Sequence, residues 1–235
     1  MAIVISRLAS YASKSMWSDY ISGASRVQFV TVAKWMIVRH GETEWNRDGR
    51  IQGRADTPLS EEGRVQAGAL GAALKDVRID RAFSSDLSRA RDTAALVLGE
   101  RQVKINIDGN LQELNFGRWE GQFGAELAER ERDLFFAWHT GNPDFKAPGG
   151  EGVRDLVRRT EKFVSDHGAD MVQGTSLIVA HGGTVRGLMH VMLGISLSIV
   201  GRFNVARASL SILEVEPEGS VLLLYNDVSH YRRQV

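Results

Sequence analysis

Short apolar runs rich in β-branched residues alternate with longer segments of helical period along most of this chain. The short runs predict strands at 34–39, 80–84, 103–107, 175–180, 208–215 and 220–225. The longer segments predict helices at 60–76, 88–98, 124–138, 151–167 and 184–193. Strands and helices that alternate in this way are typical of the α/β class. We therefore expect a three-layer αβα sandwich with helices flanking a mostly parallel central sheet.

The helix expected at 60–76 has a well-marked start. The Ser60 hydroxyl suits an N-cap, and Glu61 and Glu62 then fall in a first turn that favours negative charge. Its small apolar residues predict that the face toward the sheet runs through Val65, Ala69, Ala72 and Ala73.

Residues 1–33 differ in composition from the rest of the chain. They are rich in serine and carry Arg7, Lys14 and Arg26 against the lone acid Asp19. This composition fits an organellar transit peptide, an ordinary polar extension, or a start codon read too far upstream. Residues 34–235 are long enough for one sizeable α/β domain. We expect a serine-rich extension at 1–33 and one domain at 34–235.

The charge and cysteine content exclude several classes of protein. Lys and Arg number 29, as do Asp and Glu, so no net charge draws the protein to nucleic acid or to an anionic membrane. Cysteine is absent, which excludes disulfides, thiolate catalysis and cysteine-bound metals. No apolar stretch approaches the roughly 20 residues that span a bilayer. We expect a cytoplasmic protein, with organellar targeting and a homodimer left open.

Two His-Gly pairs follow predicted strands. Arg39 ends the run 34–39 and is followed by His40 and Gly41, and His181 and Gly182 come after 175–180. Open α/β sheets present their chemistry at the carboxyl ends of strands, so the two imidazoles are expected to meet at one sheet edge. An arginine beside them suits a phosphate, because its planar fork binds two phosphate oxygens at once.

Several segments together resemble the histidine phosphatase superfamily, the phosphoglycerate-mutase-like enzymes. They are 38–46, 84–90, 111–121 and 181–184, and the resemblance extends from about Lys34 to His230. It implies a phosphomonoester hydrolase, or histidine phosphatase, that acts through a phosphohistidine intermediate and needs no cofactor or metal. Its partner would be a small phosphorylated substrate.

The resemblance also implies roles for individual residues. His40 would be the nucleophile, and a protonated His181 would stabilise the transition state. Arg39 and Arg89 would bind the phosphoryl oxygens. Glu113 would protonate the leaving oxygen and later deprotonate water, with Glu120 as the competing carboxylate.

The remaining phosphate- and substrate-binding positions follow from the same segments. Gly41 has no Cβ, so its backbone could approach the phosphate closely. Gly182 opens a helix whose N-terminus offers backbone donors to an anion. The resemblance places three further positions in the pocket, Asn46, Gln52 and Gly53, with Arg50 as a weaker candidate.

A metal site is the weaker enzyme interpretation. His40, His181 and Glu113 could form a two-histidine, one-carboxylate site, but the neighbouring arginines would repel a cation. We therefore expect metal-independent chemistry.

A phosphoglycerate mutase and a catalytically weak phospho-ligand binder are the alternatives. His181 is followed by Gly182, Gly183 and Thr184 rather than by the mutase pattern Gly-Asn-Ser, which favours a phosphatase. The region from Gly117 to Gly150 lacks the paired arginines of a mutase. Its aromatic residues could form a lid over the leaving group or simply pack the fold, and they are Phe123, Phe135, Phe136, Trp138 and Phe145. The physiological substrate stays open.

Overall fold

The computed structural model of the protein describes residues 33–216 and 219–231. The predicted extension 1–33 lies outside these residues, except for Ala33, with which the first strand begins. All six predicted strands are present in one sheet of order β3-β2-β4-β1-β5-β6. The strands are β1 (Ala33–Arg39), β2 (Arg81–Ser84), β3 (Ile105–Ile107), β4 (Thr175–Ala180), β5 (Leu210–Glu216) and β6 (Gly219–Asp227).

The register of the two central strands brings the two histidines together. β1 and β4 run parallel, and Arg39 at the end of β1 is the partner of Ala180 at the end of β4. His40 and His181 therefore leave adjacent strands at the same level. β2 is parallel to β3 and β4, whereas β5 and β6 add antiparallel pairs at one side of the sheet.

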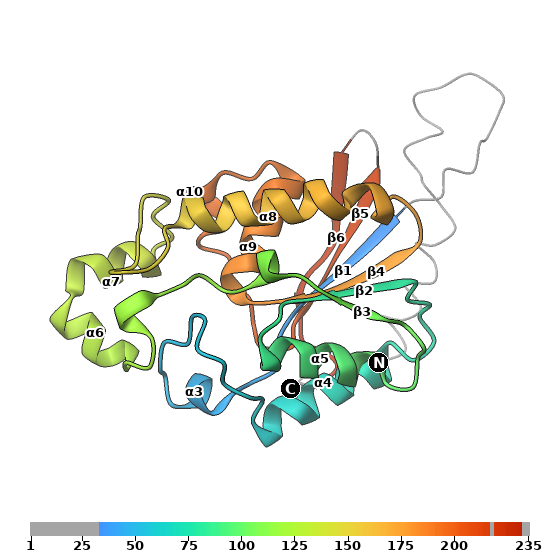
Figure 1. Ribbon diagram of the computed structural model, residues 1–235, viewed down its shortest axis with the longest axis horizontal. Coiled ribbons are helices and arrows are strands. Elements are labelled where there is room, and N and C mark those ends of the chain that lie inside the picture. The colour runs from blue at the N-terminus through green and yellow to red at the C-terminus, as the bar shows by residue number, and fades with distance from the viewer. Residues whose placement is uncertain (1–32, 217–218, 232–235) are drawn as a thin grey trace.

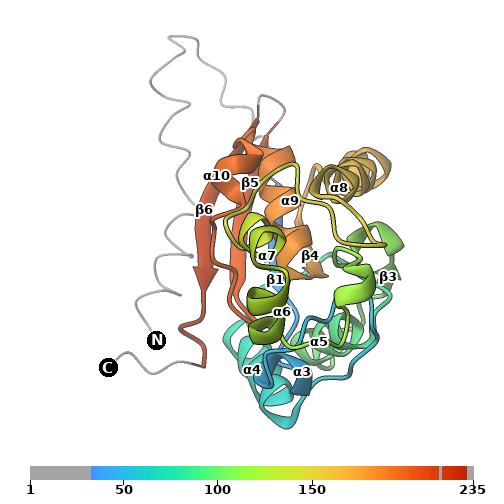
Figure 2. The same cartoon turned by 90° about the vertical axis from the view of Figure 1, so that its left-hand side faces the viewer.

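Helices cover both faces of this sheet, as predicted (Figures 1 and 2). One face carries α4 (Glu61–Ala73) and α5 (Ser88–Leu98), and the other carries α8 (Val153–His167) and α9 (Gly182–Leu193). An apolar core lies on each face of the sheet. β1 contributes side chains to both cores in turn, because successive side chains of a strand point to opposite faces. Trp35 and Ile37 belong to the core under α8 and α9, and Met36 and Val38 belong to the core under α4 and α5.

The face of α4 that packs on the sheet is not the predicted one. Ser60 caps the helix by accepting a hydrogen bond from the Gly63 amide, as expected, but Val65 is 57% exposed. The larger apolar side chain of Leu70 decides the orientation of the helix. Residues spaced from it by three, four and seven positions share its side, and the buried positions are Gly63, Gln66, Ala67, Leu70 and Leu74.

The segment between β3 and α8 departs most from the prediction. The expected helix 124–138 is divided at Glu131 into α6 (Gly124–Arg130) and α7 (Arg132–His139), because Glu131 has a non-helical backbone. The Glu131 carboxylate accepts a hydrogen bond from the Trp119 indole. The sequence did not predict the short elements α3 (Glu44–Arg47), α10 (Leu197–Val200) and the 3₁₀ turns Gly109–Leu111, Gly117–Trp119 and Gly168–Met171.

Most aromatic residues of this segment pack the fold rather than form a lid. Phe145 is buried in a cluster with Trp119 and Phe116, and Phe135 packs against it. Of the five aromatic residues that the sequence offered as a possible lid, Trp138 alone lines the cavity described below. No helix among the described residues is long and apolar enough to cross a membrane.

Candidate active site

A cavity of about 290 Å³ opens at the carboxyl ends of β1 and β4. Residues from distant parts of the chain meet there because the parallel strands β1, β2 and β4 all end at this edge. Most of the predicted site residues line it, namely Arg39, His40, Asn46, Gln52, Gly53, Arg89, Glu113 and Gly182. The predicted residues Gly41 and His181 are not part of the lining.

His40 is neutral and has one defined tautomer. Its Nδ1 lies 2.7 Å from the Gly41 carbonyl oxygen, which can only accept a hydrogen bond, so Nδ1 carries the proton. Nε2 therefore keeps its lone pair. Burial lowers the pKa of His40 well below its usual 6.5, and the charges of Arg89 and Arg39 lower it further. Neutrality and a free Nε2 are what a nucleophilic imidazole requires.

His181 lies beside His40, with ring centroids 5.1 Å apart. It is fully buried, and neither ring nitrogen has a hydrogen-bond partner among the described residues. Burial, Arg89 and His40 hold its pKa well below 6.5. Burial first, and the surrounding cations second, therefore disfavour a protonated His181 in the ligand-free site, and its predicted role in the transition state stays a prediction. A phosphate dianion would shift that balance toward protonation.

Two buried arginines supply the positive charge. Arg89 has no exposed surface, and its two terminal nitrogens donate to the carbonyls of Gly53 and Ala55 at 2.7 and 2.8 Å. Arg39 donates to the Val205 carbonyl. Burial lowers the pKa of each to about 10, so both stay charged at neutral pH. The Nε of each is buried without a partner among the described residues, an arrangement that favours an anionic ligand.

Two side-chain amides at the cavity wall have their oxygen atoms held by Thr43. The Gln52 carbonyl oxygen accepts hydrogen bonds from Thr43 and Thr57, which leaves its NH₂ group as the free end. Asn46 forms a capping box with Thr43, in which its carbonyl oxygen accepts from the Thr43 amide. Both side chains can therefore offer N–H donors to a bound anion.

The predicted glycines serve two different purposes. A Cβ on Gly41 would lie 2.5 Å from the Gly63 carbonyl oxygen, so the lack of a side chain at Gly41 allows α4 to approach the end of β1. Gly41 is not among the residues that line the cavity, and the predicted approach of its backbone to the phosphate stays a prediction. Gly53 has φ +57°, and a Cβ there would lie 2.1 Å from a Glu120 oxygen. Its carbonyl, as noted, holds Arg89.

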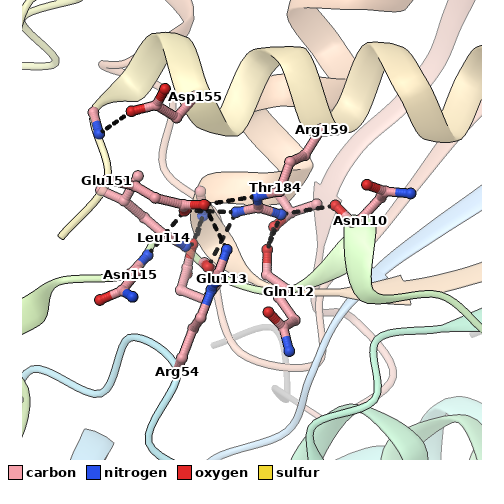
Figure 3. A network of polar contacts seen from close by, with 12 residues as sticks. Arg54, Asn110, Gln112, Glu113, Leu114, Asn115, Glu151, Asp155, Arg159 and Thr184 are labelled. Carbon is pink, nitrogen blue, oxygen red and sulfur yellow. Dashed lines mark hydrogen bonds and ion pairs between the residues drawn. The ribbon is translucent and has the colours of Figure 1, made fainter.

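Glu113 is held at the N-terminus of α9. The Gly183 amide lies 3.1 Å from each carboxylate oxygen, and the Leu114 amide donates to Oε1 at 2.9 Å. Thr184 donates to the Gln112 carbonyl at 2.7 Å, which fixes the loop against the same helix end (Figure 3). The helix donors predicted for phosphate are thus partly used by the carboxylate, as the positive end of a helix dipole allows.

Glu113 and Arg39 face the same part of the cavity. The position that a Cβ would take on Gly182 lies 3.7 Å from Glu113 Oε2 and 3.6 Å from Arg39 Cζ. Glu120 is excluded as the acid, because its Oε1 accepts from the amides of Arg54 and Phe116 and it does not line the cavity. Among the described residues, no group of three or more His, Asp or Glu side chains could hold a metal ion.

Sequence reasoning missed the other end of the cavity. Arg186 and a set of apolar side chains line it, and the set is Leu114, Phe116, Val153, Leu156, Val157, Leu197 and Val200. These residues belong to no sequence motif, and in the sequence they look like ordinary helix and loop positions. The ion network of Arg54, Glu151 and Arg159, which lies behind Glu113, was also missed. Only the preceding Pro148, Gly149 and Gly150 marked that region as irregular.

Comparisons with known proteins agree with this geometry. A family model described as the histidine phosphatase superfamily (branch 1) matches residues 35–228. The adenosylcobalamin/alpha-ribazole phosphatase of Salmonella typhimurium is 34% identical over 196 residues, which cover 83% of this chain and 97% of that protein. An Escherichia coli protein called "Probable phosphoglycerate mutase GpmB" is 32% identical over 200 residues, covering 83% and 93%.

A solved structure shares the fold. Bacillus stearothermophilus YhfR superposes with a TM-score of 0.80 at 30% identity, covering 85% of this chain and 99% of that one. The family and the α/β fold class predicted from the sequence are thereby confirmed, as is the enzyme class. The chain belongs to branch 1 of the histidine phosphatase superfamily and is a hydrolase of phosphomonoesters.

Proposed function

We propose that this enzyme hydrolyses small phosphomonoesters through a phosphohistidine on Nε2 of His40. The 2.7 Å contact between His40 Nδ1 and the Gly41 carbonyl oxygen is the observation that carries the proposal, because a proton on Nδ1 leaves the Nε2 lone pair available. The unpartnered Nε atoms of Arg39 and Arg89 support a phosphoryl group as the ligand in front of it.

In the first step Nε2 attacks phosphorus and the ester P–O bond breaks. Glu113, in its protonated form, gives its proton to the leaving oxygen, so that the product departs as an alcohol. The Glu113 carboxylate and the Arg39 guanidinium both lie close to Gly182, which supports this division of roles. The nitrogen lone pair forms the new P–N bond.

In the second step a water molecule attacks the phosphohistidine. Glu113, now a carboxylate, accepts a proton from the water as its oxygen bonds to phosphorus. The P–N bond then breaks, inorganic phosphate leaves, and Nε2 recovers its lone pair. Arg39 and Arg89 stabilise the charge spread over the phosphoryl oxygens in both steps. Because these cations supply the charge, activity should survive exhaustive chelation, and strict dependence on a metal ion would contradict this.

Hydrolysis is favoured over mutase chemistry by the surroundings of Gly183. A Cβ at this position would lie 2.3 Å from Glu113 Oε1, so a mutase-like asparagine has no room unless the acid moves. Neither Arg130 nor Arg132 lines the cavity. The Arg130 guanidinium instead forms an ion pair with the Glu131 carboxylate, with Nη2 and Oε1 3.6 Å apart. No second phosphate site is therefore supplied by the region in which mutases carry paired arginines.

The test is to trap the intermediate. Brief reaction of the wild type with labelled p-nitrophenyl phosphate should leave an acid-labile, base-stable phosphate on the protein, and His40→Ala should abolish both labelling and turnover. Glu113→Gln should still bind phosphate but turn over roughly 100-fold more slowly. Full activity in His40→Ala would contradict the proposed mechanism. Rapid isomerisation of phosphoglycerates with a bisphosphoglycerate primer, exceeding phosphate release, would decide for a mutase.

A further inference from the structure

Three charged side chains that do not touch the phosphate end form one network behind the loop of Glu113 (Figure 3). Glu151, just before α8, accepts from Arg54 at 2.5 Å and from Arg159 at 3.0 and 3.1 Å. The Glu151 and Arg159 side chains are less than one-fifth exposed. A partly buried, two-point ion pair of this kind is worth more than a surface pair and holds a fixed geometry.

The network is bonded to the main chain on both sides of Glu113. Arg159 donates to the carbonyls of Gln112 and Glu113 at 3.1 and 3.2 Å, and to that of Asn110 at 2.8 Å. Glu151 accepts from the amide of Asn115 at 3.1 Å. The backbone just before and just after the acid is therefore held by the same ion pair, in addition to the hydrogen bond from Thr184 to the Gln112 carbonyl.

The third member connects this loop to the phosphate end. Arg54 follows Gly53, whose carbonyl holds Arg89, and the Arg54 amide donates to Glu120 at 2.9 Å. A continuous path of hydrogen bonds thus runs from the phosphate-binding arginine through residues 53 and 54 to Glu151 and Arg159. The elements that carry the acid and the cation are held in one frame.

We propose that Glu151 and Arg159 are positioning residues, which keep the Glu113 carboxyl at the distance from the leaving oxygen that proton transfer requires. The inference rests on the proposed role of Glu113. General acid catalysis depends steeply on placement, and a shift of about 1 Å can cost on the order of 100-fold in rate. The Gly183 and Leu114 amides hold the carboxylate itself, whereas the ion pair holds the loop that bears it.

The leaving group separates this role from a general loss of folding. p-Nitrophenolate departs as a stable anion and needs no proton, whereas the alkoxide of glycerol 3-phosphate needs one. kcat/KM reports steps up to phosphoryl transfer, so the later role of Glu113 toward water does not enter it. Glu151→Gln should lower kcat/KM for glycerol 3-phosphate by about 10-fold and lower it far less for p-nitrophenyl phosphate.

Two further variants and a control complete the test. Arg159→Lys should show the same selectivity, because an ammonium cannot span the Glu151 carboxylate and three carbonyls. Arg158→Lys makes the same substitution at the neighbouring position of α8, where the side chain is 67% exposed, and should change neither substrate. In the Glu113→Gln background, Glu151→Gln should cause no further selective loss, as expected for residues that act as one unit.

The outcomes are distinct. Equal losses of kcat/KM on both substrates in Glu151→Gln and Arg159→Lys would show that the network only supports the fold, and would overturn the inference. A full further selective loss when Glu151→Gln is added to Glu113→Gln would also overturn it. If Glu113→Gln itself showed no selectivity for glycerol 3-phosphate, the proposed function of Glu113 would fail instead. Thermal unfolding of each variant, measured beside the kinetics, shows whether both losses reflect instability.

Discussion

The phosphate end of the cavity is built around the ends of β1 and β4, whereas its other end is walled by side chains of helices and loops. His40 follows β1 and lines the cavity, and His181 follows β4 at the same level, with the two ring centroids 5.1 Å apart. Trp138, Leu156 and Val200 come from α7, α8 and α10. The strand ends are set by hydrogen bonds across the sheet, whereas the helical wall depends on how separate helices pack. One end is suited to a constant phosphoryl group and the other to a variable leaving group.

The two ends also differ in polarity. The phosphate end concentrates buried cations and N–H donors, and the other end is largely apolar, with Arg186 as a further charged member of the wall. Mutations at the first end should therefore affect every substrate, and mutations at the second should affect some substrates more than others. The predictions below test this difference.

Apart from the loss of the nucleophile His40, the largest general loss is expected at Arg89. Arg89→Lys keeps the charge, but its single ammonium cannot donate to the carbonyls of both Gly53 and Ala55 and still offer an N–H to the phosphate. Removing one such donor typically costs roughly 100- to 1,000-fold in kcat, and all monoesters should suffer alike. Steady-state kinetics on three unrelated phosphomonoesters measure it. A loss confined to one substrate would contradict the assignment of Arg89 to the phosphate end.

A smaller effect is expected on stability at low pH. Burial, with the nearby arginines, holds the folded-state pKa of His40 and His181 well below 6.5, whereas both return to about 6.5 in the unfolded chain. Below that pH the unfolded chain binds protons that the folded protein does not, so the free energy of unfolding falls. The stability is fully present above pH 6.5 and decreases by up to about 1.4 kcal/mol per pH unit for each histidine.

Urea unfolding between pH 7 and 5 measures this slope. His40→Asn should remove part of it, because one buried titrating group is gone. His139→Asn is the matched control, since His139 is exposed on α7, and it should leave the slope unchanged. A wild-type stability that stays flat over this range would show that the two histidines are not held neutral.

The strand pattern and the phosphate end could be predicted from the sequence because both depend on local signals. Apolar runs mark the strands, and His40 and His181 stand directly after two of them. The orientation of α4 was predicted wrongly, since alanines at helical spacing say little about which side carries Leu70. The close approach of Gly41 to Gly63 was not predicted either, because Gly63 lies on another element.

The helical wall and the ion network could not be predicted for a different reason. Glu151 precedes α8 and Arg159 lies within it, but both contact the loop that carries Glu113. No pattern of spacing along the chain predicts that contact. Charged residues on helices are usually solvated, so nothing singled out Arg159. Such residues are identified only when the tertiary contacts are known.

The smallest and most selective effect is expected at the apolar end, at Trp138. This side chain lines the cavity, and its loss would remove apolar surface that a bulky leaving group can cover. Trp138→Ala should lower kcat/KM for naphthyl phosphate by roughly 5-fold, in keeping with about 1 kcal/mol of lost apolar contact. Glycerol 3-phosphate should change less, because its small leaving group covers less of the wall.

Phe136 on the same helix provides the matched control for Trp138. It is 66% exposed and does not line the cavity, so Phe136→Ala should change neither substrate. Trp138 also packs against Phe116, with ring centroids 5.3 Å apart, so thermal unfolding has to accompany the kinetics. Equal losses on both substrates in Trp138→Ala would mean that this end of the cavity acts on the phosphoryl group as well. The division between a constant and a variable end would then be wrong.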